Sequence, residues 1–361
     1  MCFQRNSRVN AVLLATSFLA GGSASAQTDS TAPFHGAPRA SWIAPPGVAT
    51  DSFVVFHARR SVEFTALPTT FVVHVSADNR YRLFVNGKSV AAGPQRADVA
   101  HWRYETIDIA PQLRSGRNVI AAVIWNWGAQ RPLAQHSLRT GFVLQGDTPE
   151  SAALMNTGAG WKLRVDSAYT PIPFTYDMVG GYYAAAPGES VDGARVPWGW
   201  EQRDYRDDEW YTVTARDSTQ SVGRLRLRAD PRGPGTGEVS GWQLVPRELP
   251  PMEETVQRIP RLRRTIGMAA DDSFLRGNAD LVIPGHTAAS LLVDQGHTTT
   301  AYPVLETSGG AGATVTLTYA EALIDARGEK GHRDSITRRT IRGVHDVFRP
   351  AGDRRSFQPL W

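Results

Sequence analysis

The sequence predicts an all-β fold made of tandem antiparallel β-sandwiches, and two observations support this prediction. Helical periodicity is scarce, whereas short runs of alternating apolar and polar residues are frequent. The 33 glycines and 23 prolines fall largely between these runs, as expected for many short strands joined by turns. The pattern therefore favours an antiparallel sandwich over an α/β sheet.

The first strand-rich region begins with two short β-branched and aromatic runs, 71–75 and 81–85, separated by a bend. A second turn follows at Asn86-Gly87, and Asn-Gly supplies the positive φ that a tight hairpin needs. Further strands are expected at 54–60, 119–125, 141–145 and 161–165.

A second strand-rich region follows a stretch rich in glycine and proline. Its expected strands are 290–293, 302–306 and 314–320, with a glycine-rich turn at 309–312. We predict a signal peptide (1–26), a flexible leader (27–40), an N-terminal sandwich domain (41–228), a linker (229–250) and a second sandwich domain (251–361). The second domain is expected to be truncated at its C-terminal end, because the sequence stops on an aromatic half-strand.

The first 26 residues have the pattern of a secretory signal. Arg5 and Arg8 form a positive start, residues 11–22 form a short apolar core, and Ala24-Ser25-Ala26 has the small-x-small pattern of a cleavage site. The apolar run is shorter than the roughly 20 residues that span a bilayer. We therefore expect a periplasmic or secreted protein with no membrane partner.

Cysteine usage and charge exclude several functions. The single cysteine, Cys2, lies inside the predicted signal, so the mature chain has no thiol for disulfides, nucleophilic catalysis or metal binding. The net charge of +4 falls further when Arg5 and Arg8 are removed with the signal. Such a balance argues against a nucleic-acid partner, and the basic run 258–264 is interpreted as a solvated face.

Carboxylates do not form an evident catalytic pair. Glycosidases need two facing carboxyl groups, but Asp271-Asp272 and the run 207–209 are adjacent residues, and neighbours in a strand point to opposite faces. Residues 207–210 are better interpreted as a turn anchored by Trp210. We predict solvent-face or edge positions for Glu306 and Glu321, and no catalytic residue in this chain.

Metal binding has little support. The nine histidines are scattered without His-x-x-x-His spacing, so no cofactor is predicted. Asp78 and Asn79 are weak candidates for calcium, which binds side-chain oxygens. The alternative is an Asx turn that closes the hairpin between the runs 71–75 and 81–85.

The tryptophans indicate more about function than the carboxylates or the histidines do. Indole faces stack on sugar rings, and nearby amide or guanidinium groups bind hydroxyls. A Trp-Asn-Trp run follows an apolar strand, and a Trp-Gly-Trp run follows Pro197. The candidate carbohydrate contacts are Trp125, Asn126, Trp127, Arg131, Trp198 and Trp200. The alternative is that these tryptophans pack in a sandwich core.

Several sequence motifs resemble those of a known enzyme family. The motifs at 294–303 (DQGHTTTAYP), 309–323 and 328–334 resemble the sandwich that leads into the catalytic barrel of bacterial α-L-rhamnosidases. Residues 76–88 (SADNRYRLFVNGK) resemble the N-terminal jelly-roll of these enzymes, a galactose-binding-like sandwich, and residues 249–254 resemble the connecting segment. The resemblance covers most of residues 41–361.

The resemblance implies inverting hydrolysis of terminal α-L-rhamnosides, with both catalytic carboxylates in an (α/α)6 barrel after the second sandwich. Nothing in this chain matches that barrel, so no catalytic residue is carried over. We expect accessory modules that are inactive alone. Their expected partners are rhamnose-containing glycans or glycosides and the missing C-terminal barrel. The alternative is a free-standing, non-catalytic carbohydrate-binding protein.

Overall fold

The computed structural model describes residues 40–181, 184–215 and 242–361. All of these residues belong to one compact unit, Ala32–Trp361. The predicted signal peptide, the leader before Ala40 and the linker residues 229–241 lie outside the described residues.

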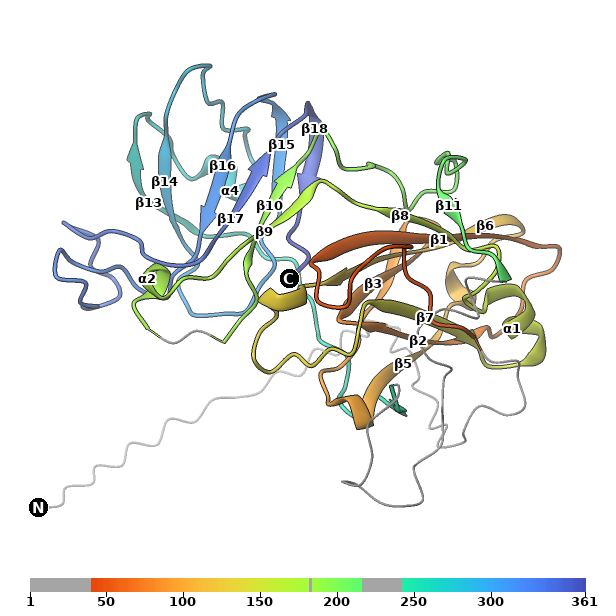
Figure 1. Ribbon diagram of the computed structural model, residues 1–361. Coiled ribbons are helices and arrows are strands. Elements are labelled where there is room, and N and C mark those ends of the chain that lie inside the picture. Colours follow the sequence, from red (N-terminus) through yellow and green to blue (C-terminus); the bar gives the residue numbers. More distant parts are fainter. Residues whose placement is uncertain (1–39, 182–183, 216–241) are drawn as a thin grey trace, which may run out of the picture. The chain divides into compact units, whose positions relative to one another are not determined.

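Two sheets form the first sandwich (Figure 1). The six-stranded sheet has the order β11-β8-β1-β6-β3-β4, and the four-stranded sheet has the order β12-β5-β2-β7. The first comprises β1 (Val54–Phe64), β3 (Arg80–Val85), β4 (Lys88–Gly93), β6 (Gly116–Asn126), β8 (Lys162–Val165) and β11 (Tyr211–Thr212). The second comprises β2 (Val72–Asp78), β5 (Trp102–Asp108), β7 (Gly141–Gly146) and β12 (Leu244–Pro246). The strands expected between 54 and 165 are confirmed.

The core lies between these two sheets. Alternate residues of β1 and β6, such as Phe56 and Ile124, pack against Val75 of β2 and Leu144 of β7. Side chains alternate between the faces of a strand, so the β-branched and aromatic runs of the sequence supply this layer. Burial of these apolar side chains supplies most of the free energy that holds the two sheets together.

The outer face of the six-stranded sheet is also buried. Val55, Ala121 and Val123 point to this face, where Trp200, Trp210 and Leu360 cover them. The covering residues come from loops and from the segment after the last strand. Because both of its faces are buried, β6 has a continuous apolar run in its sequence, whereas β1 also carries polar residues such as His57 and Arg59.

The chain changes sheets between β2 and β3. Asp78 ends β2 in the four-stranded sheet, and Arg80 begins β3 in the six-stranded sheet. The predicted hairpin between these two runs is therefore wrong. The predicted Asn-Gly hairpin is confirmed one turn later, where β3 pairs with β4, and Asn86 and Gly87 both have positive φ.

A second group of sheets is built mostly from the C-terminal region. The four-stranded sheet has the order β16-β17-β10-β9, and two pairs, β13-β14 and β15-β18, accompany it. These strands are β9 (Tyr169–Ile172), β10 (Gly188–Asp192), β13 (Arg261–Ile266), β14 (Ser290–Asp294), β15 (Leu305–Gly309), β16 (Val315–Thr318), β17 (His345–Arg349) and β18 (Gly352–Phe357). β10 runs parallel to β17, so strands from both sides of residue 228 share one sheet.

Helices are short in the described part of the chain. They are α1 (Pro149–Met155), α2 (Tyr176–Val179), α4 (Ser273–Arg276) and three 3-10 turns, Val99–His101, Ala110–Gln112 and Gly128–Gln130. None of the described helices is long and apolar enough to cross a membrane. The predicted all-β sandwich class is confirmed, and the described residues contain no helical barrel.

Candidate functional site

The calcium candidates and the Trp-Asn-Trp run lie together at one corner of the first sandwich. Asn126 ends β6, and Trp127 begins the turn Gly128–Gln130. The Asn79 side chain accepts a hydrogen bond from the Trp127 backbone at 2.9 Å. The Asn126 side-chain oxygen accepts one from the Gly128 backbone at 2.8 Å. The calcium candidates and the Trp-Asn-Trp run, predicted separately, are thus parts of one network.

The Asp78 carboxylate is the centre of this corner. Its Oδ1 accepts hydrogen bonds from Ser137 Oγ and Asn79 Nδ2, both at 2.7 Å. Its Oδ2 accepts from the Leu138 backbone at 2.7 Å and from Trp242 Nε1 at 3.0 Å. Asp78 is fully buried. One carboxylate therefore connects the sheet crossing, the loop after β6 and a segment more than a hundred residues away.

Burial and hydrogen bonding act on Asp78 in opposite directions. Removal from water raises the pKa of the Asp78 carboxyl above its ordinary value, although the bonds from Ser137, Leu138 and Trp242 act to lower it. A buried carboxyl group without such donors would cost far more. The hydrogen-bond donors therefore reduce the free-energy cost of burying the Asp78 carboxylate. The carboxylate in turn fixes the positions of these donors.

Trp125 and Trp127 lie in the same buried cluster, on the outer face of the six-stranded sheet. Their ring centroids are 6.4 Å apart, and the Trp361 ring packs against both, at 6.3 and 5.6 Å. Both indoles face the same cluster because β6 ends at Asn126, so strand alternation does not extend to Trp127. In this arrangement they are 3% and 2% exposed, as the core alternative expects.

Arg131 is the exposed member of the predicted set. Its guanidinium donates to the Gly128 carbonyl at 3.0 Å, which places it over the turn. Gly128 itself has a φ of +56°, and a Cβ there would lie 2.2 Å from the Asp51 carbonyl oxygen. Only glycine lets the turn approach the chain before β1 this closely.

The second predicted pair is separated. Trp200 joins the cluster of Trp125 and Trp127, whereas Trp198 packs with the sheet containing β10 and β17. Trp198 donates to the Gly193 carbonyl at 2.7 Å, and the Arg355 guanidinium lies 5.0 Å from its ring centroid. Trp198 and Trp200 therefore do not form one surface. Sugar contact by any of the six residues stays a prediction.

Calcium at Asp78 and Asn79 also stays a prediction. Both Asp78 carboxylate oxygens already accept several hydrogen bonds, so a cation must displace N–H or O–H donors. Within the described ranges, no group of three or more His, Cys, Asp or Glu residues is placed to hold a metal ion.

Sequence reasoning missed the distant partners of this corner. Trp242 stacks on Trp42 with ring centroids 3.8 Å apart, and its indole N–H reaches Asp78. Ser137 bonds both Asp78 and Asn126. No local motif marks Trp42, Trp242 or Ser137. The closest available signal was the unusual number of tryptophans.

The carboxylates considered for catalysis are engaged structurally or exposed. Asp207 is bound by Arg59 at 2.9 Å and by Lys162 at 2.7 Å. Asp272 pairs with Arg276 on the surface, and Glu306 pairs with Arg354. The predicted turn at 207–210 is confirmed by the bond from the Trp210 N–H to the Asp207 carbonyl at 3.1 Å.

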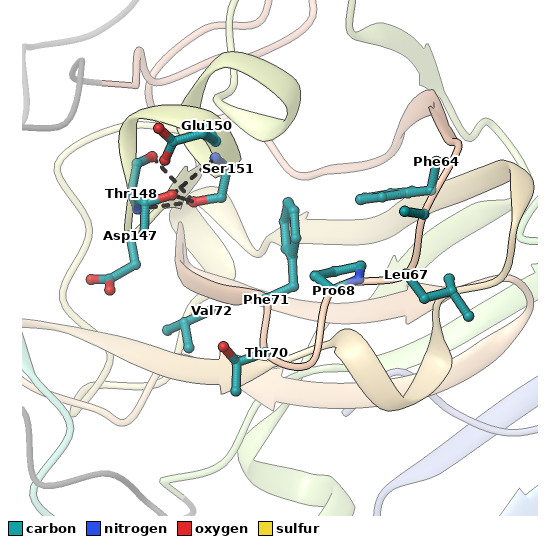
Figure 2. Close-up of a pocket in the computed structure, with 11 residues that line it drawn as sticks. Phe64, Leu67, Pro68, Thr70, Phe71, Val72, Asp147, Thr148, Glu150 and Ser151 are labelled. Carbon is teal, nitrogen blue, oxygen red and sulfur yellow. Dashed lines mark hydrogen bonds between the residues drawn. The ribbon is translucent and has the colours of Figure 1, made fainter.

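An apolar hollow of about 400 Å3 lies at the other end of the first sandwich. Figure 2 shows Asp147, Thr148, Glu150 and Ser151 on one side of Phe71, with Phe64, Leu67 and Pro68 on the other. Val72 and Asp78 are the two ends of β2, so this hollow and the Asp78 corner are at opposite ends of that strand.

Comparison with known proteins now places this architecture in a class. The structure of a GH78 family rhamnosidase from Bacillus sp. GL1 aligns with 63% of the chain at 24% identity and a TM-score of 0.50. The α-L-rhamnosidases of Aspergillus terreus and Dictyoglumus thermophilum align with 90% and 89% of it, at 15% identity and TM-scores of 0.55. A search of the curated proteins finds no match. These likenesses define the fold class: tandem β-sandwiches as found in α-L-rhamnosidases.

The sequence itself matches a family model. Residues 68–231 match the model described as the α-L-rhamnosidase N-terminal domain. The match includes Asp78, Asn79 and both tryptophan runs. The chain covers 21% of the Bacillus structure and 33% and 32% of the other two, so it corresponds to a minor part of those proteins.

Proposed function

We propose that this chain forms the accessory sandwiches of an exported enzyme that hydrolyses terminal α-L-rhamnosides. The observation that carries the proposal is the match of residues 68–231 to the α-L-rhamnosidase N-terminal domain. The hydrolytic carboxylates belong, in this proposal, to a catalytic barrel that the described residues do not contain. The sandwiches then support that barrel, and the chain alone is inactive.

The positions of two buried carboxyl groups support the proposal that the chain alone does not hydrolyse rhamnosides. The Glu189 backbone donates to Asp346 at 2.7 Å, so these two acids are neighbours. Glu189 is fully buried and Asp346 is nearly so. Neither lines the hollow beside Phe71 or a second cavity of about 150 Å3, which His57, Arg82 and Trp200 line. A glycosidase pair must flank a substrate and a water molecule, and these two groups do not.

The direct test is hydrolysis of an aryl α-L-rhamnoside by the purified chain. We expect release of the phenol at the buffer background. The matched variants are Glu189→Gln and Asp346→Asn, which remove the charge of either buried acid. Turnover by the parent that one of these substitutions abolishes would overturn the proposal.

Export is a second part of the proposal, and it rests on residues 1–26. N-terminal sequencing of protein recovered from the periplasm or medium is expected to begin at Gln27. Material that still begins at Met1 would contradict export by this signal.

A free-standing carbohydrate-binding protein is the competing function. The exposed Arg131 beside the buried Trp-Asn-Trp run favours it, because a guanidinium offers forked donors to vicinal hydroxyls. Titration with L-rhamnose, followed by tryptophan fluorescence, compares the parent with Trp125→Ala, Trp127→Ala and Arg131→Ala. Selective loss of binding in folded variants supports the corner as a sugar site; unchanged binding places the contact elsewhere.

A further inference from the structure

The second cavity, of about 150 Å3, lies over the outer face of the six-stranded sheet. This is roughly the volume that five water molecules take up in the liquid, so the space suits a small ligand. Its lining includes Arg82 of β3 and Val123 of β6. Ser356, near the end of β18, and Gln358, just after it, form another wall, and Trp200 closes a side.

Arg82 supplies the fixed charge of this lining. Its guanidinium is half-buried and donates to Gln358 Oε1 at 3.2 Å, and the Tyr302 ring centroid lies 5.6 Å from the guanidinium carbon. In the described part of the chain, no carboxylate forms an ion pair with Arg82. A guanidinium has five N–H donors, so most of them are left for a ligand.

Two neutral donors stand beside this charge. Arg82 has only donors, so the oxygen of the Gln358 amide faces it, and the amide nitrogen is left to donate elsewhere. Ser356 and Gln358 flank Phe357, which is buried against Phe348. Alternate residues of an extended chain point to the same side, so the Ser356 hydroxyl and the Gln358 amide share one wall of the cavity.

Arg80 adds to the positive potential of this face. It lies two positions before Arg82, on the same side of β3, and is half-buried. Within the described ranges, Arg80 forms no ion pair. Its nearby acid, Glu105, is already bound by Arg247 at 3.1 Å, and its neighbour Arg96 is a second cation. Arg80 does not line the cavity, but its charge attracts the same class of ligand.

Two carboxyl groups near the cavity are buried and already bonded. Asp166 Oδ2 lies 2.8 Å from His57 Nε2, and Oδ1 accepts from the Ala168 backbone at 2.9 Å. Glu189 accepts from the Leu360 N–H, and burial raises the pKa of Glu189 well above its ordinary value, which favours its neutral form. Neither group lines the cavity, so the positive charge of Arg82 decides which ligand enters.

This charge and these donors match a carboxylate. Apolar walls such as Val123 and Trp200 strengthen the attraction between a guanidinium and an anion. A planar carboxylate accepts two parallel hydrogen bonds from a guanidinium, and its remaining lone pairs accept from an amide or a hydroxyl. We propose that the cavity lined by Arg82, Ser356 and Gln358 binds the carboxylate of a small acid, either an acidic sugar ring or a short organic acid.

The experiment is calorimetric titration of the chain with D-galacturonate and with D-galactose. These two rings differ in one group, a carboxylate in place of a hydroxymethyl, so the pair isolates the charge. We expect D-galacturonate to bind about tenfold or more tightly, the effect of one charge-assisted hydrogen bond. Equal or weaker binding of D-galacturonate would overturn the carboxylate assignment.

Acetate then distinguishes the two sources of the carboxylate. Acetate binding within about tenfold of D-galacturonate assigns the cavity to short organic acids, and weaker binding assigns it to acidic sugars. The choice of sugars as probes rests on the proposed rhamnosidase function, whereas acetate tests the site without it. No measurable binding of either carboxylate by the folded parent overturns the site, while the rhamnosidase assignment, tested by hydrolysis and export, is unaffected.

Variants locate the binding. Arg82→Met is expected to weaken D-galacturonate binding about tenfold or more, and Arg82→Lys, which keeps the charge but not the fork, is expected to weaken it less. Gln358→Leu, which removes a neutral donor, is expected to weaken binding about threefold to tenfold. Arg354→Met removes a guanidinium from an exposed pair on the same strand, β18, and is expected to leave binding unchanged.

Thermal unfolding confirms that each variant is folded before it is titrated. If Arg82→Met does not fold, Arg82→Lys and Gln358→Leu carry the test. Binding of D-galacturonate that is unchanged in folded Arg82→Met, or in both of the other two variants, would place the carboxylate outside this cavity and overturn the proposal.

Discussion

Arg59 and Asp207 lie 148 positions apart in the sequence, yet Arg59 Nε donates to Asp207 Oδ2 at 2.9 Å. The guanidinium is fully buried on the outer face of β1. It also donates to the carbonyls of Trp200 and Gln202, and Lys162 adds a second cation to Asp207. Burial acts to raise the pKa of Asp207, but the bonds and charges of Lys162 and Arg59 outweigh it, so the pKa lies below its ordinary value.

We expect Asp207→Ala to lower the free energy of unfolding by about 3–5 kcal/mol, because it leaves the buried Arg59 cation without its counter-charge. Urea denaturation measures the change. Asp208→Ala removes an exposed neighbour and is expected to change stability by less than about 0.5 kcal/mol. Equal effects of the two substitutions would show that Arg59 does not depend on Asp207.

Asp78→Ala is expected to lower the free energy of unfolding by about 3 kcal/mol or more, since several donors lose a charged acceptor while they remain buried. The change should also alter the environment of Trp242, which near-ultraviolet circular dichroism detects. Asp51→Ala, at an exposed position, is the control. An unchanged Trp242 signal would contradict the central role of the Asp78 carboxylate.

Gly128→Ala and Gly47→Ala form a matched pair, because both glycines have positive φ, +56° and +78°. A Cβ at Gly47 meets open space, whereas one at Gly128 lies 2.2 Å from the Asp51 carbonyl oxygen. We expect Gly47→Ala to cost about 1 kcal/mol from backbone strain alone. Gly128→Ala should cost more by about 1–3 kcal/mol from the clash; equal losses in urea denaturation would sink this explanation of the turn.

Burial, followed by repulsion from Asp346, raises the pKa of Glu189 well above its ordinary value of 4.5. A raised carboxyl pKa means that the folded state binds the proton more tightly than the unfolded state. This contribution to stability is present below the unfolded pKa and is lost as the pH rises from about 4.5 through the folded pKa.

Glu189→Gln removes this dependence and keeps an amide oxygen that can accept from the Leu360 N–H, now bonded to Glu189 at 3.2 Å. We expect the variant to be more stable than the parent at neutral pH and to show a flatter stability profile between about pH 5 and pH 8. Glu63→Gln, at an exposed position, is the control. A profile that parallels the parent would contradict the raised pKa.

Local patterns sufficed for much of the fold. The alternation around Tyr81 and Leu83 and the Asn86-Gly87 turn predicted β3 and the hairpin turn that follows it, because strand face and turn type depend on neighbouring residues. The change of sheet after Asp78 was not predictable in this way. The partner of a strand depends on which face it buries, and that depends on residues far along the chain.

The candidate site was predictable in its members but not in its geometry. Trp125, Asn126 and Asp78 were noticed as residue types suited to binding, and the structure joins them. Burial of the tryptophans under Trp361 and Trp200 follows from long-range packing. Trp242 gave no local signal, because its partner Asp78 lies 164 positions away.

The parallel pairing of β10 with β17 bears on how this protein can be divided for experiments. A fragment ending at residue 228 would keep β9 and β10 but lose β17. The side of β10 (Gly188–Asp192) that pairs with β17 would then be an unpaired sheet edge. It would also lose β12 beside β5 and the indole that stacks on Trp42. Unpaired edges recruit other chains, so such a fragment is expected to aggregate, and the two sandwiches are best expressed together.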